Sequence, residues 1–164
     1  MADPLNPAET VPQKSSKGKK PAWRTWLIFA AVLAGIYFGN TAVQTYLGKQ
    51  ALAQTGLELI DMNEALARAR TENKLVLADM SAIWCPSCRK LDKQVLSNPA
   101  VKAAIARGYV FTRVEYESDE GRAFAKRYQV DGFPTLLVLD PQGELLRKLP
   151  LTFDPQHFIS LLSS

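Results

Sequence analysis

The chain has 164 residues, of which 47% are hydrophobic and 22% are charged, and its formal net charge is +4. This length and composition predict one globular domain of about 100–120 residues with additional segments. Residues 1–25 hold five Lys or Arg against two acidic residues, whereas residues 47–164 hold fifteen against fourteen. The positive charge therefore lies in the N-terminal tail, and the folded part lacks the basic surface that nucleic-acid binding requires.

Residues 1–22 are predicted to form a disordered basic tail. They contain four prolines and show no apolar periodicity, so they have nothing to bury. The alternative is a basic arm for nucleic acid. An apolar segment follows the lysines at once, which is more typical of a topology signal that keeps the tail in the cytoplasm.

An uncharged, mainly apolar segment of 18 residues spans positions 26–43. As a helix it is about 27 Å long, close to the hydrocarbon thickness of about 30 Å. Trp23 and Trp26 at one end and Tyr46 at the other are placed for the two interfaces. We therefore predict a single transmembrane helix over residues 23–47, in a bacterial inner membrane, with the C-terminal domain in the periplasm.

Two alternatives remain for this segment. The strictly apolar core, residues 26–38, is only 13 residues long, as in a cleaved signal peptide, and Ala51-Leu52-Ala53 resembles a cleavage site. A buried core helix is the other alternative. Residues 48–56 are interpreted as a linker or a polar continuation of the helix.

Residues 57–164 alternate between apolar runs and helical patterns. Predicted strands cover residues 57–60, 75–78, 109–114, 136–139 and 144–149. Predicted helices cover residues 62–72, 89–96, 99–105, 119–128 and 155–162. This order predicts an α/β domain with a central mixed sheet flanked by helices.

The only two cysteines, Cys85 and Cys88, lie where a predicted strand runs into a helix. Two thiols at this spacing can close a small disulfide ring, Cys85–Cys88, and this favours a dithiol redox site over two structural cysteines. At the start of a helix Cys85 faces unpaired backbone N–H groups, which predicts a lowered pKa and an attacking thiolate. Cys88, one turn further on, is predicted to resolve the mixed disulfide.

Asp79 ends an otherwise apolar strand. A carboxyl group buried there has a raised pKa, which suits proton exchange with Cys88. The alternative is a half-exposed aspartate that caps a loop.

The chain from residue 57 onward resembles a thioredoxin-fold domain, and in particular the C-terminal domain of periplasmic transmembrane disulfide reductases. Asp79 lies six residues before Cys85, Trp84-Cys85-x-x-Cys88 opens a helix, and Phe133-Pro134-Thr135 precedes a strand. The resemblance implies a cis Pro134 opposite the cysteines. It also implies client contacts by Trp84, Phe133, Pro134 and Thr135, with packing inside the domain as the alternative for the Phe133 ring.

Two further positions bear on the resemblance. Arg113 stands where a lysine near the buried acid is common in the family. Ser81 replaces an aromatic residue of the best-known members, so partner specificity does not transfer from soluble thioredoxins.

These features predict a thiol:disulfide oxidoreductase, without metal or cofactor, that reduces client proteins and receives electrons from a membrane redox partner. An oxidase or isomerase of exported proteins and a non-enzymatic tethered binding module are the alternatives. Zinc needs four ligands, and the chain offers only His157 besides the cysteines. Haem attachment needs a histidine at position 89, which is Arg89.

Overall fold

The computed structural model describes residues 22–163, so most of the predicted tail, residues 1–21, lies outside the described residues. The strands are β1 (Leu75–Ser81), β2 (Tyr109–Glu115), β3 (Thr135–Leu139) and β4 (Leu145–Leu149). The helices are α1 (Ala22–Thr55), α2 (Met62–Glu72), α3 (Pro86–Leu91), the π-helix η1 (Asp92–Leu96), α4 (Pro99–Gly108), α5 (Asp119–Tyr128) and α6 (Pro155–Ser163).

The four strands form one sheet in the order β2-β1-β3-β4. β1 pairs in parallel with β2 and antiparallel with β3, and β3 pairs antiparallel with β4. The predicted mixed α/β sheet is therefore confirmed, with β1 at its centre. The cysteine motif follows this central strand directly.

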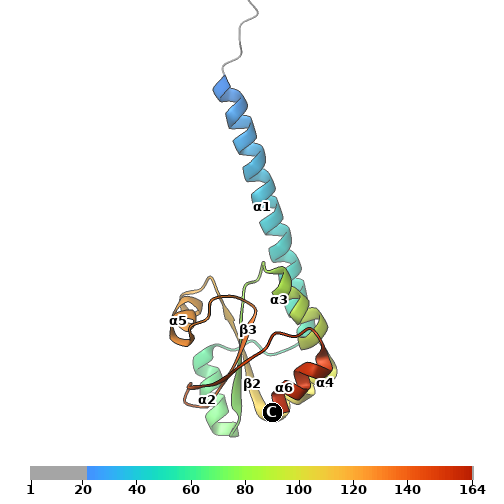
Figure 1. The fold of residues 1–164 in the computed structure, drawn as a ribbon, viewed down its shortest axis with the longest axis vertical. Coiled ribbons are helices and arrows are strands. Elements are labelled where there is room, and N and C mark those ends of the chain that lie inside the picture. The colour runs from blue at the N-terminus through green and yellow to red at the C-terminus, as the bar shows by residue number, and fades with distance from the viewer. Residues whose placement is uncertain (1–21, 164) are drawn as a thin grey trace, which may run out of the picture. The chain divides into compact units, whose positions relative to one another are not determined.

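Helices cover both faces of the sheet, as Figure 1 shows for α2 and α5 on one side and α4 and α6 on the other. Alternate residues of a strand point to opposite faces. Leu77 of β1 accordingly packs with α4, α6 and η1, whereas Val76 and Met80 pack with α2 and α5. Asp79 shares the parity of Leu77, which directs its side chain toward the face that carries η1.

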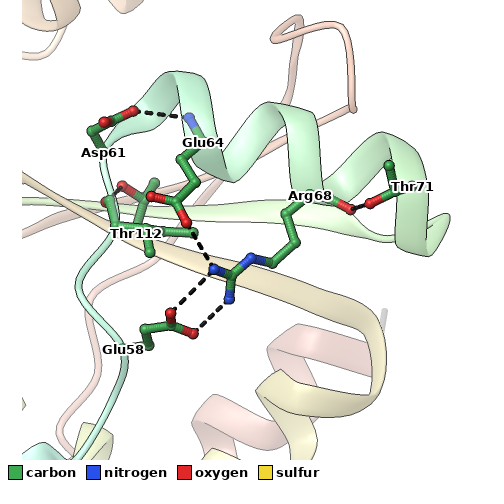
Figure 2. A network of polar contacts seen from close by, with 7 residues as sticks. Glu58, Asp61, Glu64, Arg68, Thr71 and Thr112 are labelled. Atoms are coloured by element: carbon green, nitrogen blue, oxygen red, sulfur yellow. Dashed lines mark hydrogen bonds and ion pairs between the residues drawn. The ribbon is translucent and has the colours of Figure 1, made fainter.

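The predicted strand at residues 57–60 is wrong: the structure has irregular backbone there. The segment contacts β2 through a side chain instead of a strand ladder, because Thr112 Oγ1 donates a hydrogen bond of 2.8 Å to the Ile60 carbonyl. Glu58 pairs with Arg68 of α2, and Asp61 caps that helix (Figure 2). Residues 57–60 are therefore held in place by side-chain contacts. Their apolar residues, taken alone, had favoured a strand.

Packing divides the chain into two units between Tyr37 and Phe38, and α1 contributes to both. In the first unit the large apolar side chains of α1 are more than half exposed, and the helix is long and apolar enough to cross a membrane. In the second unit α1 continues to Thr55, so residues 48–55 are helical. Ala51 and Thr55 are fully buried there.

Candidate functional site

The two cysteines lie at the start of α3, immediately after a turn that leaves β1. The Cys85 N–H donates to the Ala82 carbonyl at 2.9 Å, which closes this turn. Cys85 is the N-cap residue of α3, with Pro86 in the first turn. Its sulfur accepts a hydrogen bond of 3.2 Å from the Cys88 N–H. The backbone thus presents a donor to the sulfur expected to carry negative charge.

Both cysteines are free thiols in this structure, so the Cys85–Cys88 disulfide stays a prediction. Cys85 is 6% exposed and Cys88 is 1% exposed, which gives Cys85 the better access to another protein. Burial and the hydrogen bond with Cys85 raise the pKa of the Cys88 thiol. Cys88 therefore keeps its proton at neutral pH unless a nearby base removes it.

Asp79 lies on β1 with its side chain fully buried. Its register partner on β2 is Arg113, whose Nη1 lies 3.4 Å from Asp79 Oδ2. Ser81, two residues along the same face of β1, donates a hydrogen bond of 2.7 Å to Asp79 Oδ1. The structure thus confirms the arginine beside the buried acid, and it excludes the half-exposed loop cap.

A second buried carboxylate, Asp92, completes this group. Arg113 Nη1 donates a hydrogen bond of 2.8 Å to Asp92 Oδ1, and the Asp92 side chain is 1% exposed. Sequence reasoning missed Asp92. The available signal was its position four residues after Cys88, which places both on one helix face, among the apolar residues Leu91 and Val95.

The π-helical turn η1 begins at Asp92. A π-turn adds one residue to the helical ladder and is often found at functional sites. Here it follows α3 directly, so that the helix carrying the cysteines continues into the turn that carries the second acid.

Asp79, Asp92 and Arg113 form what we call the buried charge triad. Burial raises the pKa of the Asp79 carboxyl, although Arg113 and Ser81 lower it. Burial also raises the pKa of Asp92 to about 6, against the opposing charge of Arg113 and with a further rise from Asp79. One guanidinium cannot neutralise two buried carboxylates, so the triad favours retention of one proton.

The triad interacts electrostatically with Cys88. The charge of Asp79 contributes to the raised pKa of Cys88. The charge of Cys88 contributes to the raised pKa of Arg113. Oδ2 of Asp79 and Oδ2 of Asp92 make no hydrogen bond to the described residues. No hydrogen-bond donor therefore stabilises the charged form at these two oxygens, and their burial favours uptake of a proton.

Two of the four predicted client residues, Trp84 and Phe133, lie beside the cysteines. Trp84 and Phe133 pack against the cluster of Ala82 and the two cysteines, and their rings meet edge to face with centroids 5.5 Å apart. The Phe133–Pro134 bond is cis, as the resemblance implied, and Pro134 is buried.

Two residues modify the expected client surface. Thr135 uses its hydroxyl internally, because Oγ1 donates to the Gly132 carbonyl at 2.7 Å. Tyr116, which sequence reasoning left without a role, lies with its ring 4.9 Å from that of Phe133 and is 41% exposed. We call Trp84, Tyr116 and Phe133 the aromatic rim.

The sequence also singled out His157 and position 89. His157 is exposed on α6. In the part of the chain that the structure describes, no group of three or more His, Cys, Asp or Glu is arranged to hold a metal ion. Arg89 is half-buried and donates a hydrogen bond of 2.6 Å to Oε1 of Gln44 of α1.

Comparison with known proteins agrees with this geometry. The family model described as thioredoxin-like matches residues 58–141. The thiol:disulfide interchange protein DsbD 2 of Pseudomonas aeruginosa is 33% identical over 140 residues, covering 84% of this chain and 22% of that protein. This chain therefore spans less than a quarter of that relative's length.

Solved structures show the same fold. A thioredoxin from Thermus thermophilus superposes with a TM-score of 0.59 at 28% identity, covering 65% of this chain and 85% of that one. The oxidised C-terminal domain of DsbD from Neisseria meningitidis gives a TM-score of 0.52 at 26% identity, covering 64% of this chain and 96% of that one. These likenesses support an oxidoreductase, and the chain belongs to the thioredoxin-like family.

Proposed function

We propose that this chain is a membrane-tethered thiol:disulfide oxidoreductase that reduces disulfides of client proteins through Cys85 and Cys88. The main support is the free Cys85 sulfur at the N-cap of α3, together with a buried Cys88 thiol whose pKa is raised by burial and in part by the charge of the buried Asp79 carboxyl, the candidate base. A structural cysteine pair needs no such base. A resolving thiol does need one, because only the thiolate attacks a disulfide.

In the first step the Cys85 thiolate attacks one sulfur of a client disulfide. The client S–S bond breaks, a Cys85–client S–S bond forms, and the released client thiolate takes up a proton. The Cys88 N–H, which lies 3.2 Å from the Cys85 sulfur, stabilises the thiolate before attack. The aromatic rim supplies apolar contacts beside the reacting sulfur.

In the second step Cys88 resolves the mixed disulfide. Its thiol proton passes to Asp79, whose raised pKa makes it a stronger base than an ordinary carboxylate. The Cys88 sulfur then attacks the Cys85 sulfur, and the Cys85–Cys88 disulfide forms. The second client thiolate leaves and is protonated, so the client gains two electrons and two protons.

The oxidised pair must be reduced again before another turnover. A membrane-bound dithiol donor fits this need, because α1 carries a candidate membrane span on the same chain. We place the N-terminal tail in the cytoplasm of a bacterium and the thioredoxin-like domain on the outer side of the inner membrane. The lysines before the span support this orientation.

Thiol counting on the full chain in detergent tests the redox chemistry. A redox enzyme has two free thiols per chain after treatment with dithiothreitol and none after oxidation. A tethered binding module without redox chemistry keeps the same number of free thiols under both treatments. Equilibration with a glutathione series tests the direction. A potential well below about −180 mV supports a reductase, and one well above it supports the alternative, an oxidase.

A further inference from the structure

The last turns of α1 pack onto the thioredoxin-like domain through one helix face. Side chains from Trp23 to Asn40 are exposed, whereas Gln44 is half-buried and Gly48, Ala51 and Thr55 are buried. These positions are spaced four, three and four residues apart, which is the spacing of a single face. Because the buried residues are small, this face allows close backbone approach.

Gly48 makes the closest approach, and it does so at the cysteine turn. A Cβ atom at this position would overlap the Ile83 carbonyl oxygen and lie 2.9 Å from the carbonyl carbon. Both clashing atoms are backbone, so they can move only if the turn itself moves. Gly39, on the same helix, has nothing within 4 Å of the equivalent position.

Ile83 is also held from the opposite side. Its N–H donates a hydrogen bond of 2.9 Å to Oε1 of Glu115, the last residue of β2. The peptide groups on either side of this residue are thereby fixed by two different elements, α1 and β2. Ile83 lies two residues before Cys85, and the turn that it belongs to closes at the Cys85 N–H.

A second contact reaches the other side of the cysteine motif. Gln44 Oε1 accepts a hydrogen bond of 2.6 Å from Nη1 of Arg89, the residue directly after Cys88. Gln44 and Gly48 lie one helical turn apart. One face of α1 therefore contacts the chain just before Cys85 and just after Cys88.

We propose that Gly48 and Gln44 are positioning residues of the redox site, which hold the turn from Ala82 to Cys85 and the start of α3 in the geometry that sets the reactivity of Cys85. This inference rests on the proposed function. It makes the C-terminal part of α1, from Gln44 to Thr55, part of the construction of the active site. The segment is more than a spacer between an anchor and an independent domain.

The steric contact is tested with Gly48→Ala in the full chain, with Gly39→Ala as the matched control. Both changes add one methyl group to α1, but only the first displaces Ile83. We expect Gly48→Ala to change the alkylation rate of Cys85 and the equilibrium with glutathione by about fivefold or more, since small displacements of reacting groups have large effects on rate. Gly39→Ala should match the wild type in both.

The polar contact is tested with Gln44→Ala, which adds no bulk and keeps the helix. The exposed Gln54 on the same helix provides the control, Gln54→Ala. We expect Gln44→Ala to shift both readouts by about threefold, and to have no further effect in an Arg89→Ala background, because the partner is then absent.

The possible results distinguish a failure of the proposed redox function from a failure of the positioning role of Gly48 and Gln44. If the wild type does not cycle between two thiols and one disulfide, the proposed function fails. If the wild type cycles but Gly48→Ala and Gln44→Ala both match it, only the positioning role is overturned. If Gly48→Ala does not fold, Gln44→Ala with its Arg89→Ala background decides alone.

Discussion

Arg113 donates a hydrogen bond of 2.8 Å from Nη1 to Oδ1 of Asp92, and both side chains are at most 5% exposed. The same nitrogen lies 3.4 Å from Asp79 Oδ2. One buried cation thus faces two buried carboxylates that come from a strand and from the π-turn after the cysteine helix. Because burial raises the pKa of both carboxyl groups, the arrangement favours retention of a proton within the buried charge triad.

The raised pKa of Asp92 makes the stability of the domain depend on pH. Between about pH 4 and pH 6 the folded state binds more protons than the unfolded state, so the free energy of unfolding falls as pH rises. Asp92→Asn removes this loss. Urea unfolding should show the wild type losing up to about 2–3 kcal/mol relative to the variant across this range.

The exposed Asp131 supplies a control for that measurement. The free energy of unfolding of Asp131→Asn should differ from that of the wild type by the same amount at every pH. Parallel curves for Asp92→Asn as well would show that the Asp92 carboxyl titrates alike in the folded and unfolded states, contrary to its burial.

Asp79→Asn removes the proposed acceptor of the Cys88 proton while retaining the shape of the side chain. Resolution of the mixed disulfide should slow by about 100-fold near pH 7, within the range measured for general bases. The defect should shrink as the pH rises well beyond the ordinary thiol pKa of about 8.5, because hydroxide can then deprotonate the Cys88 thiol, whose pKa is raised by burial, without help from Asp79. Rapid-quench measurement of the resolution step tests this, and equal rates across pH would contradict the role.

Cys88→Ser separates the roles of the two sulfurs. A serine cannot resolve the mixed disulfide, so the Cys85–client adduct should accumulate and be visible on a non-reducing gel. Cys85→Ser should give no adduct, because the remaining thiol is buried and protonated. Adducts of equal yield in both variants would show that either sulfur attacks clients.

Tyr116→Ala removes the most exposed ring of the aromatic rim. We expect the KM for a protein client to rise by about threefold to tenfold, as for a typical apolar contact at an interface. The alkylation rate of Cys85 by a small reagent should not change. The exposed Leu146 on β4 provides a control, and Leu146→Ala should leave the KM unaltered.

Local patterns were sufficient for most of the fold. The apolar runs at β1 and β3 and the helical spacing of α2 and α5 are properties of short segments, so they are legible without a structure. The conformation of residues 57–60 does not follow from the local pattern. Its apolar residues suit a strand, but the choice between a ladder and a side-chain contact with Thr112 depends on a neighbour distant in sequence.

The candidate site divides in the same way. Cys85, Cys88 and Asp79 were predictable, because residue type and spacing carry their chemistry. The position of Arg113 near the buried Asp79 was suggested only by the resemblance to the thioredoxin family. Asp92 was missed because an aspartate in a helix is usually solvated, and its ion pair with Arg113 of β2 is a contact between residues distant in sequence.

Residue types and spacings were enough to predict the α/β class, the dithiol motif, its strand-to-helix position and the apolar segment at the N-terminus. The support of the motif depends on contacts between distant parts of the chain. Parallel pairing of β1 with β2 brings Arg113 to Asp79, and packing of α1 brings Gly48 to Ile83. Both contacts join residues more than 30 positions apart, and no local periodicity encodes which distant backbone or charge a side chain will meet.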